Sequence, residues 1–248
     1  MALGPIFQSG GAAAGVALSP HQCALLERYV GLVLSWRGRV NLTGVETQED
    51  AARVLVVDAL ACVPYLADRG TVVDLGSGSG TPGIPIAVVC PEVRMLLVEA
   101  SRKRAGFLGI VLRNLGLANV DVVHARAEVL GRTPAHRERH DAVTARAVAS
   151  LPVLAELALP LIRVGGLAVF PKGSHAEEEA AAAAGVLALL GGAADVRRSG
   201  MIVVRKVAPT PSLYPRRPGV PARRPLAGVP AAGGRQAPRS ANGCPGRG

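Results

Sequence analysis

The first feature of the sequence that could do chemistry is a short glycine-rich stretch. It reads DLGSGSGTPGIP over residues 74–85 and lies between two apolar runs. Glycine adopts positive φ angles at little cost and lets a ligand approach the main chain, and proline is tolerated in the first turn of a helix. We therefore expect a strand that ends at Asp74 and Leu75, a bare turn and then a helix. The turn is suited to a nucleoside-bearing ligand at the carboxyl end of the strand.

Two ligands compete for this turn. Gly78, Gly80 and Gly83 match the G-x-G-x-x-G pattern of dinucleotide-binding folds, but the strand ends before Gly76, which is too early for that register. The spacing Gly76-x-Gly78-x-Gly80, with Asp74 two residues ahead, fits S-adenosylmethionine better. That compound has no pyrophosphate that a helix N-terminus must hold. Asp74 would serve its ammonium group, and the amides of the loop would serve its carboxylate.

Three further sites carry polar side chains near the ends of apolar runs. Glu99 ends the second run, where a carboxylate can accept hydrogen bonds from both ribose hydroxyls, unless it is only a solvated strand end. Ala127 and Glu128 follow the third run and would sit beside an adenine edge, unless Glu128 is an ordinary acid at a helix start. Arg146 lies in a fourth apolar run, where a cation is costly unless paired. It therefore points either to the ligand cleft or to a buried ion pair.

The order of the apolar runs predicts the elements that position these residues. From residue 71 to 208, short apolar runs alternate with longer amphipathic ones, which predicts an α/β domain with a parallel sheet covered by helices on both faces. Residues 19–70 read as a helical extension, with Ser19 and Thr47 as helix caps. We expect residues 1–18 to be a disordered tail rather than a signal peptide. Residues 209–248 form a basic tail rich in proline and arginine, which we expect to be largely disordered after about 227.

Charge and cysteine content restrict the class of protein. Of the net charge of +10 carried by the 248 residues, +7 comes from arginines in residues 209–248, a tail without acids or lysines. Such a tail often contacts nucleic acid. The cysteines at 23, 62, 90 and 244 are too far apart for a zinc pattern, so we expect reduced thiols, no metal and a cytoplasmic location. No apolar run is long enough to cross a bilayer, so we expect no membrane partner.

Several segments together resemble the RsmG (GidB-like) family over about residues 20–226. DLGSGSGTPGIPIAV matches the loop of that family, whose double-proline ending is more specific than its glycines. LLVEASRKRAGFL, ARAEVL, TARAVASL and YPRRPGVPARRPL match further family segments. The sequence departs from the family at Leu55, where the family usually has histidine, and at Thr81, where it usually has leucine or phenylalanine.

The resemblance implies a Rossmann-like, class I S-adenosylmethionine-dependent methyltransferase fold with an N-terminal helical extension. It implies that the enzyme methylates N7 of a guanine in 16S ribosomal RNA. It also places Gly76, Thr81, Ala127, Glu128 and Arg146 at the cofactor, with Glu99 as the ribose acid. Combined with the residues singled out above, the expected cofactor-binding set is Asp74, Gly76, Ser77, Gly78, Gly80, Thr81, Glu99, Ala127, Glu128 and Arg146.

The chemistry implied by the resemblance needs little from the protein beyond positioning. Guanine N7 has a free lone pair, so no general base is required, and catalysis is largely orientation and electrostatics. We therefore name no catalytic residue and keep only Asp58 as a candidate for stabilising the positive charge that develops on the base. We expect the phosphates of 16S ribosomal RNA, or of the small ribosomal subunit, to meet basic side chains on a monomeric protein. The candidates are Arg102, Lys103, Arg104, Lys172, Arg216, Arg217, Arg223 and Arg224.

Three rival functions remain open on the sequence. The chain could be a non-catalytic RNA-binding or assembly protein on a methyltransferase-like fold, because fold does not fix function. It could also be a methyltransferase for small molecules, or an NAD-dependent oxidoreductase that uses the G-x-G-x-x-G match.

Overall fold

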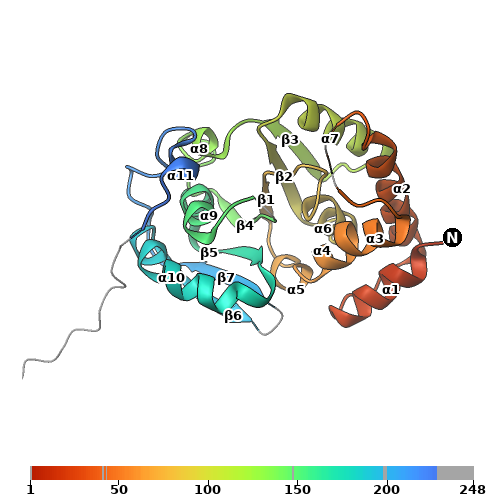
Figure 1. Ribbon diagram of the computed structural model, residues 1–248, viewed down its shortest axis with the longest axis horizontal. Coiled ribbons are helices and arrows are strands. Elements are labelled where there is room, and N and C mark those ends of the chain that lie inside the picture. The colour runs from red at the N-terminus through yellow and green to blue at the C-terminus, as the bar shows by residue number, and fades with distance from the viewer. Residues whose placement is uncertain (1, 41, 43, 147, 198–199, 228–248) are drawn as a thin grey trace, which may run out of the picture.

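A seven-stranded mixed sheet organises the part of the chain that the structure describes (Figure 1). This computed structural model describes residues 2–227 apart from 41, 43, 147, 198 and 199. The strands follow the order β3-β2-β1-β4-β5-β7-β6. Their bounds are β1 Thr71–Leu75, β2 Arg94–Glu99, β3 Val120–His124, β4 His140–Thr144, β5 Ile162–Pro171, β6 Gly192–Arg197 and β7 Met201–Lys206.

Five neighbouring strands of this sheet, from β3 through β2, β1 and β4 to β5, pair in parallel as predicted. The far edge differs from the prediction, because β7 pairs antiparallel with both β5 and β6. Strand β6 was not expected at all, since its segment GAADVR is poor in the β-branched and aromatic residues that mark strands. The sheet is therefore mixed, and its parallel part includes the strands that carry the predicted site.

Side chains alternate between the two faces of the sheet and divide the core into two clusters. Val72 belongs to the cluster beneath the N-terminal helices, whereas the next residue, Val73, belongs to the cluster on the other face. This alternation follows from the two-residue period of a strand. Because both faces are apolar, helices must cover both. These helices are α6 Gly83–Val89, α7 Arg102–Leu115, α8 Ala127–Leu130, α9 Leu151–Ala158 and α10 Ala176–Leu189. Two short 3₁₀ segments flank β5, with η2 Leu159–Leu161 after α9 and η3 Gly173–His175 before α10.

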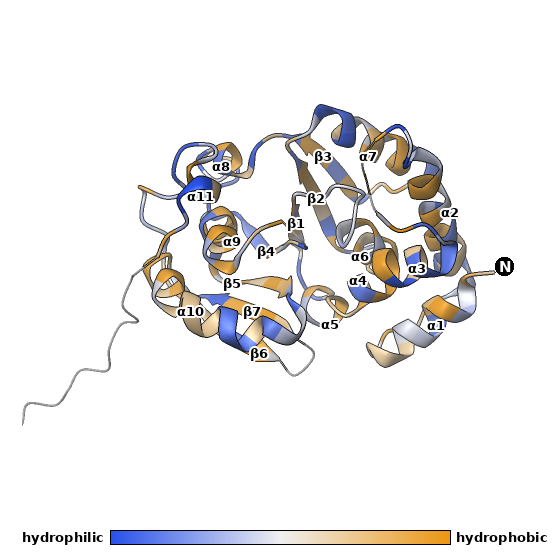
Figure 2. Ribbon diagram, viewed as in Figure 1, coloured by the Kyte–Doolittle hydropathy of each residue, from blue (hydrophilic) through white to orange (hydrophobic). Residues whose placement is uncertain are grey.

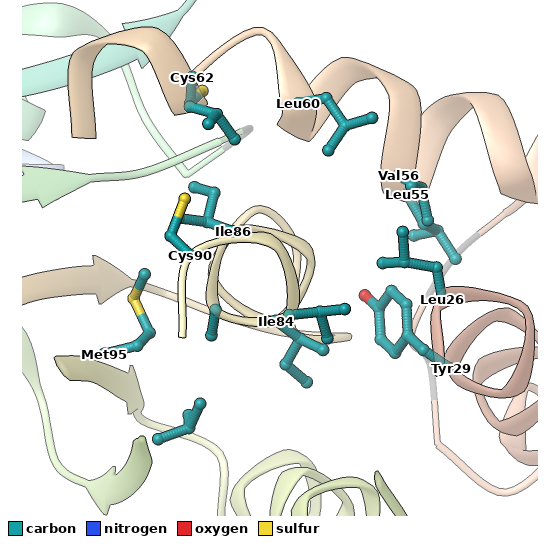
Figure 3. Packing of buried hydrophobic residues seen from close by; sticks show 14 of the residues in the cluster. Leu26, Tyr29, Leu55, Val56, Leu60, Cys62, Ile84, Ile86, Cys90 and Met95 are labelled. Atoms are coloured by element: carbon teal, nitrogen blue, oxygen red, sulfur yellow. The ribbon is translucent and has the colours of Figure 1, made fainter. Parts of the chain in front are cut away.

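The N-terminal extension is helical and packs onto α6. Helix α2, Pro20–Trp36, begins with the predicted cap, in which the Ser19 hydroxyl accepts a hydrogen bond from the Gln22 amide. Figure 3 shows Leu26 and Tyr29 of α2 facing Ile84 of α6 across the buried cluster. The rest of the extension comprises α3 Gln48–Ala52, the π-helix η1 Arg53–Val57, α4 Asp58–Leu60 and α5 Val63–Leu66. The extension is therefore helical, as the sequence predicts for residues 19–70, but its second half is divided into four short segments, one of them π-helical.

The expectation of a disordered tail over residues 1–18 is also wrong. Residues Gly4–Ala13 form helix α1, which packs against η1 and buries Phe7 completely. The sequence GPIFQSGGAA gave little sign of this, because glycine disfavours helices. Tertiary contacts therefore stabilise the helix. None of the described helices is both long and apolar enough to span a membrane.

The described end of the chain packs back against α8 and α9. Residues 209–226, called the C-terminal strap below, include the short helix α11, Val220–Arg223, which contacts α9 (Figure 1). Of the four residues of α11, Val220, Pro221, Ala222 and Arg223, only Arg223 is charged, and the ribbon at its label is blue in Figure 2. The disorder expected after about 227 concerns residues that lie outside the described part of the chain.

Candidate functional site

The glycine loop follows β1 and has the conformation that its glycines allow. Gly76 has φ of 67° and its amide donates to the Val98 carbonyl at 2.8 Å. A Cβ at Gly76 would lie 2.8 Å from the Val148 side chain. Gly78 has φ of 55°, and a Cβ there would meet nothing closer than 3.7 Å. The loop therefore keeps bare backbone between two strand ends, as the sequence predicted.

Two further loop residues shape the turn from inside. Gly80 has φ of 105°, and its amide donates to the Ser77 carbonyl at 2.6 Å. That φ is strained for any other residue, and a Cβ on Gly80 would also lie 2.3 Å from Cδ1 of Ile84, so the position favours glycine. The Ser77 hydroxyl is buried and donates to the Asp74 carbonyl at 2.9 Å. Ser77 and Gly80 thus hold the loop, and neither lines the cleft described below.

Asp74 is the most unusual ionisable group of the loop. It is completely buried, and its Oδ2 accepts a hydrogen bond from the Gly83 amide at 3.2 Å. Among the described residues, its Oδ1 has no hydrogen-bond partner. Burial raises the pKa of Asp74 to about 7, while Arg146 acts in the lowering direction and Glu99 in the raising one. A buried acceptor without a donor in the protein is rare, so Asp74 fits a site that receives a donor from a ligand.

A cleft of about 330 Å³ opens at the carboxyl ends of β1, β2 and β3. Four of the predicted cofactor residues line it, namely Gly76, Glu99, Ala127 and Glu128. The edge of a parallel sheet where strand order reverses is the usual ligand position in open α/β folds. The cleft therefore brings these four predicted residues together, whereas the other six do not line it.

Glu99 is held firmly within this cleft. It is 4% exposed, and its two oxygens accept hydrogen bonds from the Gly78 amide at 2.9 Å and the Ser101 amide at 2.7 Å. The Arg104 guanidinium lies 3.9 Å from the carboxylate and also lines the cleft. A carboxylate fixed in this way is preorganised to accept hydrogen bonds from a pair of hydroxyl groups.

The opposite walls of the cleft come from residues that the sequence analysis did not select. Val148, Val153 and Leu157 supply apolar surface, and Gly219 and Ala222 of the C-terminal strap complete the enclosure. Apolar walls with a few polar groups are typical of small-molecule sites. In the sequence, the strap residues were part of YPRRPGVPARRPL, which resembles a segment of the family. That resemblance did not assign Gly219 or Ala222 to the cofactor site.

Arg146 and Thr81 lie elsewhere, against the π-helix η1. Arg146 donates to the Val54 carbonyl and pairs with Asp58 at 3.1 Å. The Asp58 side chain is 56% exposed, so Arg146 is paired, but not in the buried ion pair that the sequence offered as an alternative. Burial raises the pKa of Asp58, while Arg146 opposes that shift. The Thr81 hydroxyl donates to the Leu55 carbonyl at 2.8 Å. Neither Arg146 nor Thr81 lines the cleft.

The basic residues predicted to meet RNA divide into two groups. Arg102 and Lys103 are exposed at the start of α7, and Arg217, Arg223 and Arg224 are exposed on the strap. Arg104 instead lies against Glu99 in the cleft.

Lys172 and Arg216 are already paired within the protein. Lys172 donates to the Ala149 carbonyl and pairs with Glu179 at 3.0 Å. Arg216 pairs with the buried Glu156 at 2.6 Å. These two cations are therefore engaged in structural contacts, unlike the exposed ones.

Comparison with known proteins agrees with this arrangement. A similar protein from Rubrobacter xylanophilus, named ribosomal RNA small subunit methyltransferase G, is 43% identical over 229 residues, which cover 86% of this chain and 87% of that one. One of the same name from Roseiflexus castenholzii is 41% identical and covers 86% and 95% of the two chains. A solved structure from Corynebacterium glutamicum aligns with a TM-score of 0.51 at 15% identity, over 73% of this chain and 90% of that one.

The fold is that of class I S-adenosylmethionine-dependent methyltransferases, with a Rossmann-like parallel core and the antiparallel β7. The sequence model of one family, described as rRNA small subunit methyltransferase G (GidB), matches residues 22–199. Together with the relatives above, this match shows that the chain belongs to the rRNA small subunit methyltransferase G family.

Proposed function

We propose that this protein transfers the methyl group of S-adenosylmethionine to N7 of a guanine in 16S ribosomal RNA. The observation that carries the proposal is the family match over residues 22–199, which contain the glycine loop and most of the cleft. We further propose that the protein acts as a cytoplasmic monomer. Its substrate is the 16S RNA or the small ribosomal subunit.

The residues of the cleft fit the cofactor in charge and shape. Glu99 would accept from the ribose hydroxyls, and Ala127 with Glu128 would border the adenine. Asp74 is completely buried and does not line the cleft. Its Oδ1 lacks a described partner, and it would serve the ammonium group directly or through water. The amides of the glycine loop would meet the carboxylate. When bound, the cofactor supplies an electrophilic methyl group on a sulfonium.

The protein's own contribution is then to orient and to exclude water. Guanine N7 has a free lone pair, so no side chain would have to remove a proton from it. Holding the two reactants in line can supply a large part of the rate enhancement. Asp58 stays a candidate for stabilising the charged base, but its pairing with Arg146 at 3.1 Å makes a role in holding that arginine the simpler proposal.

Exposed cations flank the cleft on two sides and support binding of an RNA. Arg102 and Lys103 precede Arg104, which lines the cleft. On the other side, Arg223 and Arg224 follow Ala222, which also lines it. Phosphates that contact these cations would bring a base to the mouth of the cleft, and such binding weakens steeply with salt.

The test is methylation of 16S RNA from cells that lack this modification. The purified protein and methyl-tritiated S-adenosylmethionine should label the RNA. Borohydride reduction followed by aniline, which cleaves at 7-methylguanine, should then cut at one labelled position. A folded Gly76→Val variant is the control and should give no label. Label in free small molecules instead of RNA would favour the small-molecule alternative. An absence of transfer despite RNA binding would favour the assembly-protein alternative.

A further inference from the structure

The C-terminal strap closes one side of the cleft, and a buried ion pair anchors it. Glu156 of α9 has no exposed surface, yet it does not line the cleft. Its Oε1 accepts from the backbone amide and from Nε of Arg216, each at 2.8 Å, and its Oε2 accepts from Nη2 at 2.6 Å. The same Nη2 donates to the Arg224 carbonyl at 2.8 Å. The carboxylate therefore holds Arg216, whose guanidinium in turn holds the Arg224 carbonyl, so the ion pair fixes both ends of the segment that carries Gly219 and Ala222.

A second set of contacts holds the beginning of the strap. Arg132 Nε donates to the Pro215 carbonyl at 2.7 Å, and Arg137 Nη1 donates to the Tyr214 carbonyl at 2.8 Å. Both arginines lie between α8 and β4, and both bind main-chain oxygens of the strap. The strap is thus attached by charged hydrogen bonds, and such bonds are stronger than neutral ones.

The strap also meets the cleft through Glu128. The Gly219 amide donates to Glu128 Oε1 at 2.7 Å. Gly219 has φ of 79°, a conformation that favours glycine. Glu128 is 7% exposed and lines the cleft next to Ala127. Any displacement of the strap therefore removes a wall of the cleft and frees an acid at its nucleoside end.

We propose that the C-terminal strap is a wall of the nucleoside end of the cofactor site and that Glu156 is a positioning residue for cofactor binding. The inference rests on the proposed function, because it takes the occupant of the cleft to be an adenine nucleoside. Binding of that nucleoside and docking of the strap stabilise each other, since coupling between two sites is reciprocal. Arg216, which the sequence assigned to RNA, thereby has its main role in the cofactor site.

The first experiment measures binding of S-adenosylhomocysteine by calorimetry, without RNA. Glu156→Gln should weaken the affinity by about tenfold, a size typical of coupling between sites. Arg217→Gln is the matched control, because it removes an exposed positive charge next to Arg216, and it should leave the affinity within about twofold. In turnover, Glu156→Gln should raise KM for S-adenosylmethionine and leave kcat unchanged.

Two measurements keep the inference testable if Glu156→Gln does not fold. Ala222→Phe leaves the anchor intact and adds bulk to an exposed residue that lines the cleft, so it should weaken binding of S-adenosylhomocysteine in a folded protein. In the wild-type protein, S-adenosylhomocysteine should slow amide hydrogen exchange across residues 212–224.

The outcomes separate the inference from the proposed function. If S-adenosylhomocysteine binds the wild type but leaves exchange in the strap unchanged, or binds folded Glu156→Gln and Ala222→Phe as tightly as the wild type, the strap is not part of the site. The proposed function would then still stand. If the wild type does not bind S-adenosylhomocysteine at all, both proposals are wrong.

Discussion

Asp74 leads to a pH dependence that can be worked out in advance. Burial raises its pKa from 3.8 to about 7, and its Oδ1 has no described partner. If Asp74 receives the ammonium group of the cofactor, only molecules with an ionised Asp74 can make that contact. The apparent affinity then falls by the fraction of competent molecules. Cofactor binding should therefore strengthen as pH rises through 7.

The size of the effect follows from the position of the pKa. With a pKa of about 7, the ionised fraction of Asp74 is about one tenth at pH 6 and about nine tenths at pH 8. The apparent affinity should thus improve by about tenfold over this range, which corresponds to about 1.4 kcal/mol.

The assay is calorimetric titration with S-adenosylhomocysteine between pH 6 and pH 8, on the wild type and on Asp74→Asn. The amino group of the ligand also titrates near this range, so the ratio of the two affinities is the informative quantity. Ligand titration cancels in that ratio, while titration of Asp74 remains. A ratio that stays constant over the range would refute the assignment of Asp74 to the ammonium group.

The same carboxyl makes the ligand-free protein less stable as pH rises. Because its folded pKa lies above its unfolded value, the native state binds more protons between pH 3.8 and about 7. The free energy of unfolding therefore falls across that window. The upper limit of the loss is about 4 kcal/mol. Urea unfolding of the wild type and Asp74→Asn should show the variant gaining relative stability from pH 5 to pH 8.

Three further changes have expected outcomes. Gly76→Val should weaken cofactor binding by more than about tenfold in calorimetry, because φ of 67° is strained for valine and the new Cβ would lie 2.8 Å from Val148; affinity within that factor would contradict the loop assignment. Arg102→Gln should lower the salt slope of RNA binding by about one in filter-binding titrations, whereas Lys172→Gln should change it less, because Lys172 is paired within the protein. Removal of residues 228–248, which contain three arginines, should flatten the salt dependence further while leaving cofactor affinity unchanged; an unchanged slope would mean that these arginines do not touch RNA.

The sequence predicted the site best where local rules decide the structure. The turn after β1 needs glycines at positive φ, and Gly76 and Gly80 have it. Glu99 could be placed because the carboxyl ends of parallel strands meet at one edge of the sheet.

The sequence predicted less where contacts between residues far apart in the chain determine the structure. Helix α1 has weak local preference and is stabilised by contacts with η1, which lies beyond α2 in the sequence. Strand β6 also has weak local preference, and its contacts are with the neighbouring α10 and β7. The partners of Arg146 could not be predicted from the apolar run that contains it, because they lie 88 and 92 residues earlier in the sequence. The role of Arg216 depends on Glu156, 60 residues away.

The π-helix η1 connects the N-terminal extension to the catalytic half of the molecule. The carbonyls of two consecutive residues of η1, Val54 and Leu55, accept hydrogen bonds from Arg146 and Thr81. A carbonyl oxygen has two lone pairs, so each of these oxygens can accept a hydrogen bond from a side chain in addition to one from a helix amide. The extension and the domain should consequently unfold in a single transition. A fragment that lacked the first 70 residues would lose the Val54 and Leu55 carbonyls. Arg146 and Thr81 of the glycine loop would then have no partner at these positions.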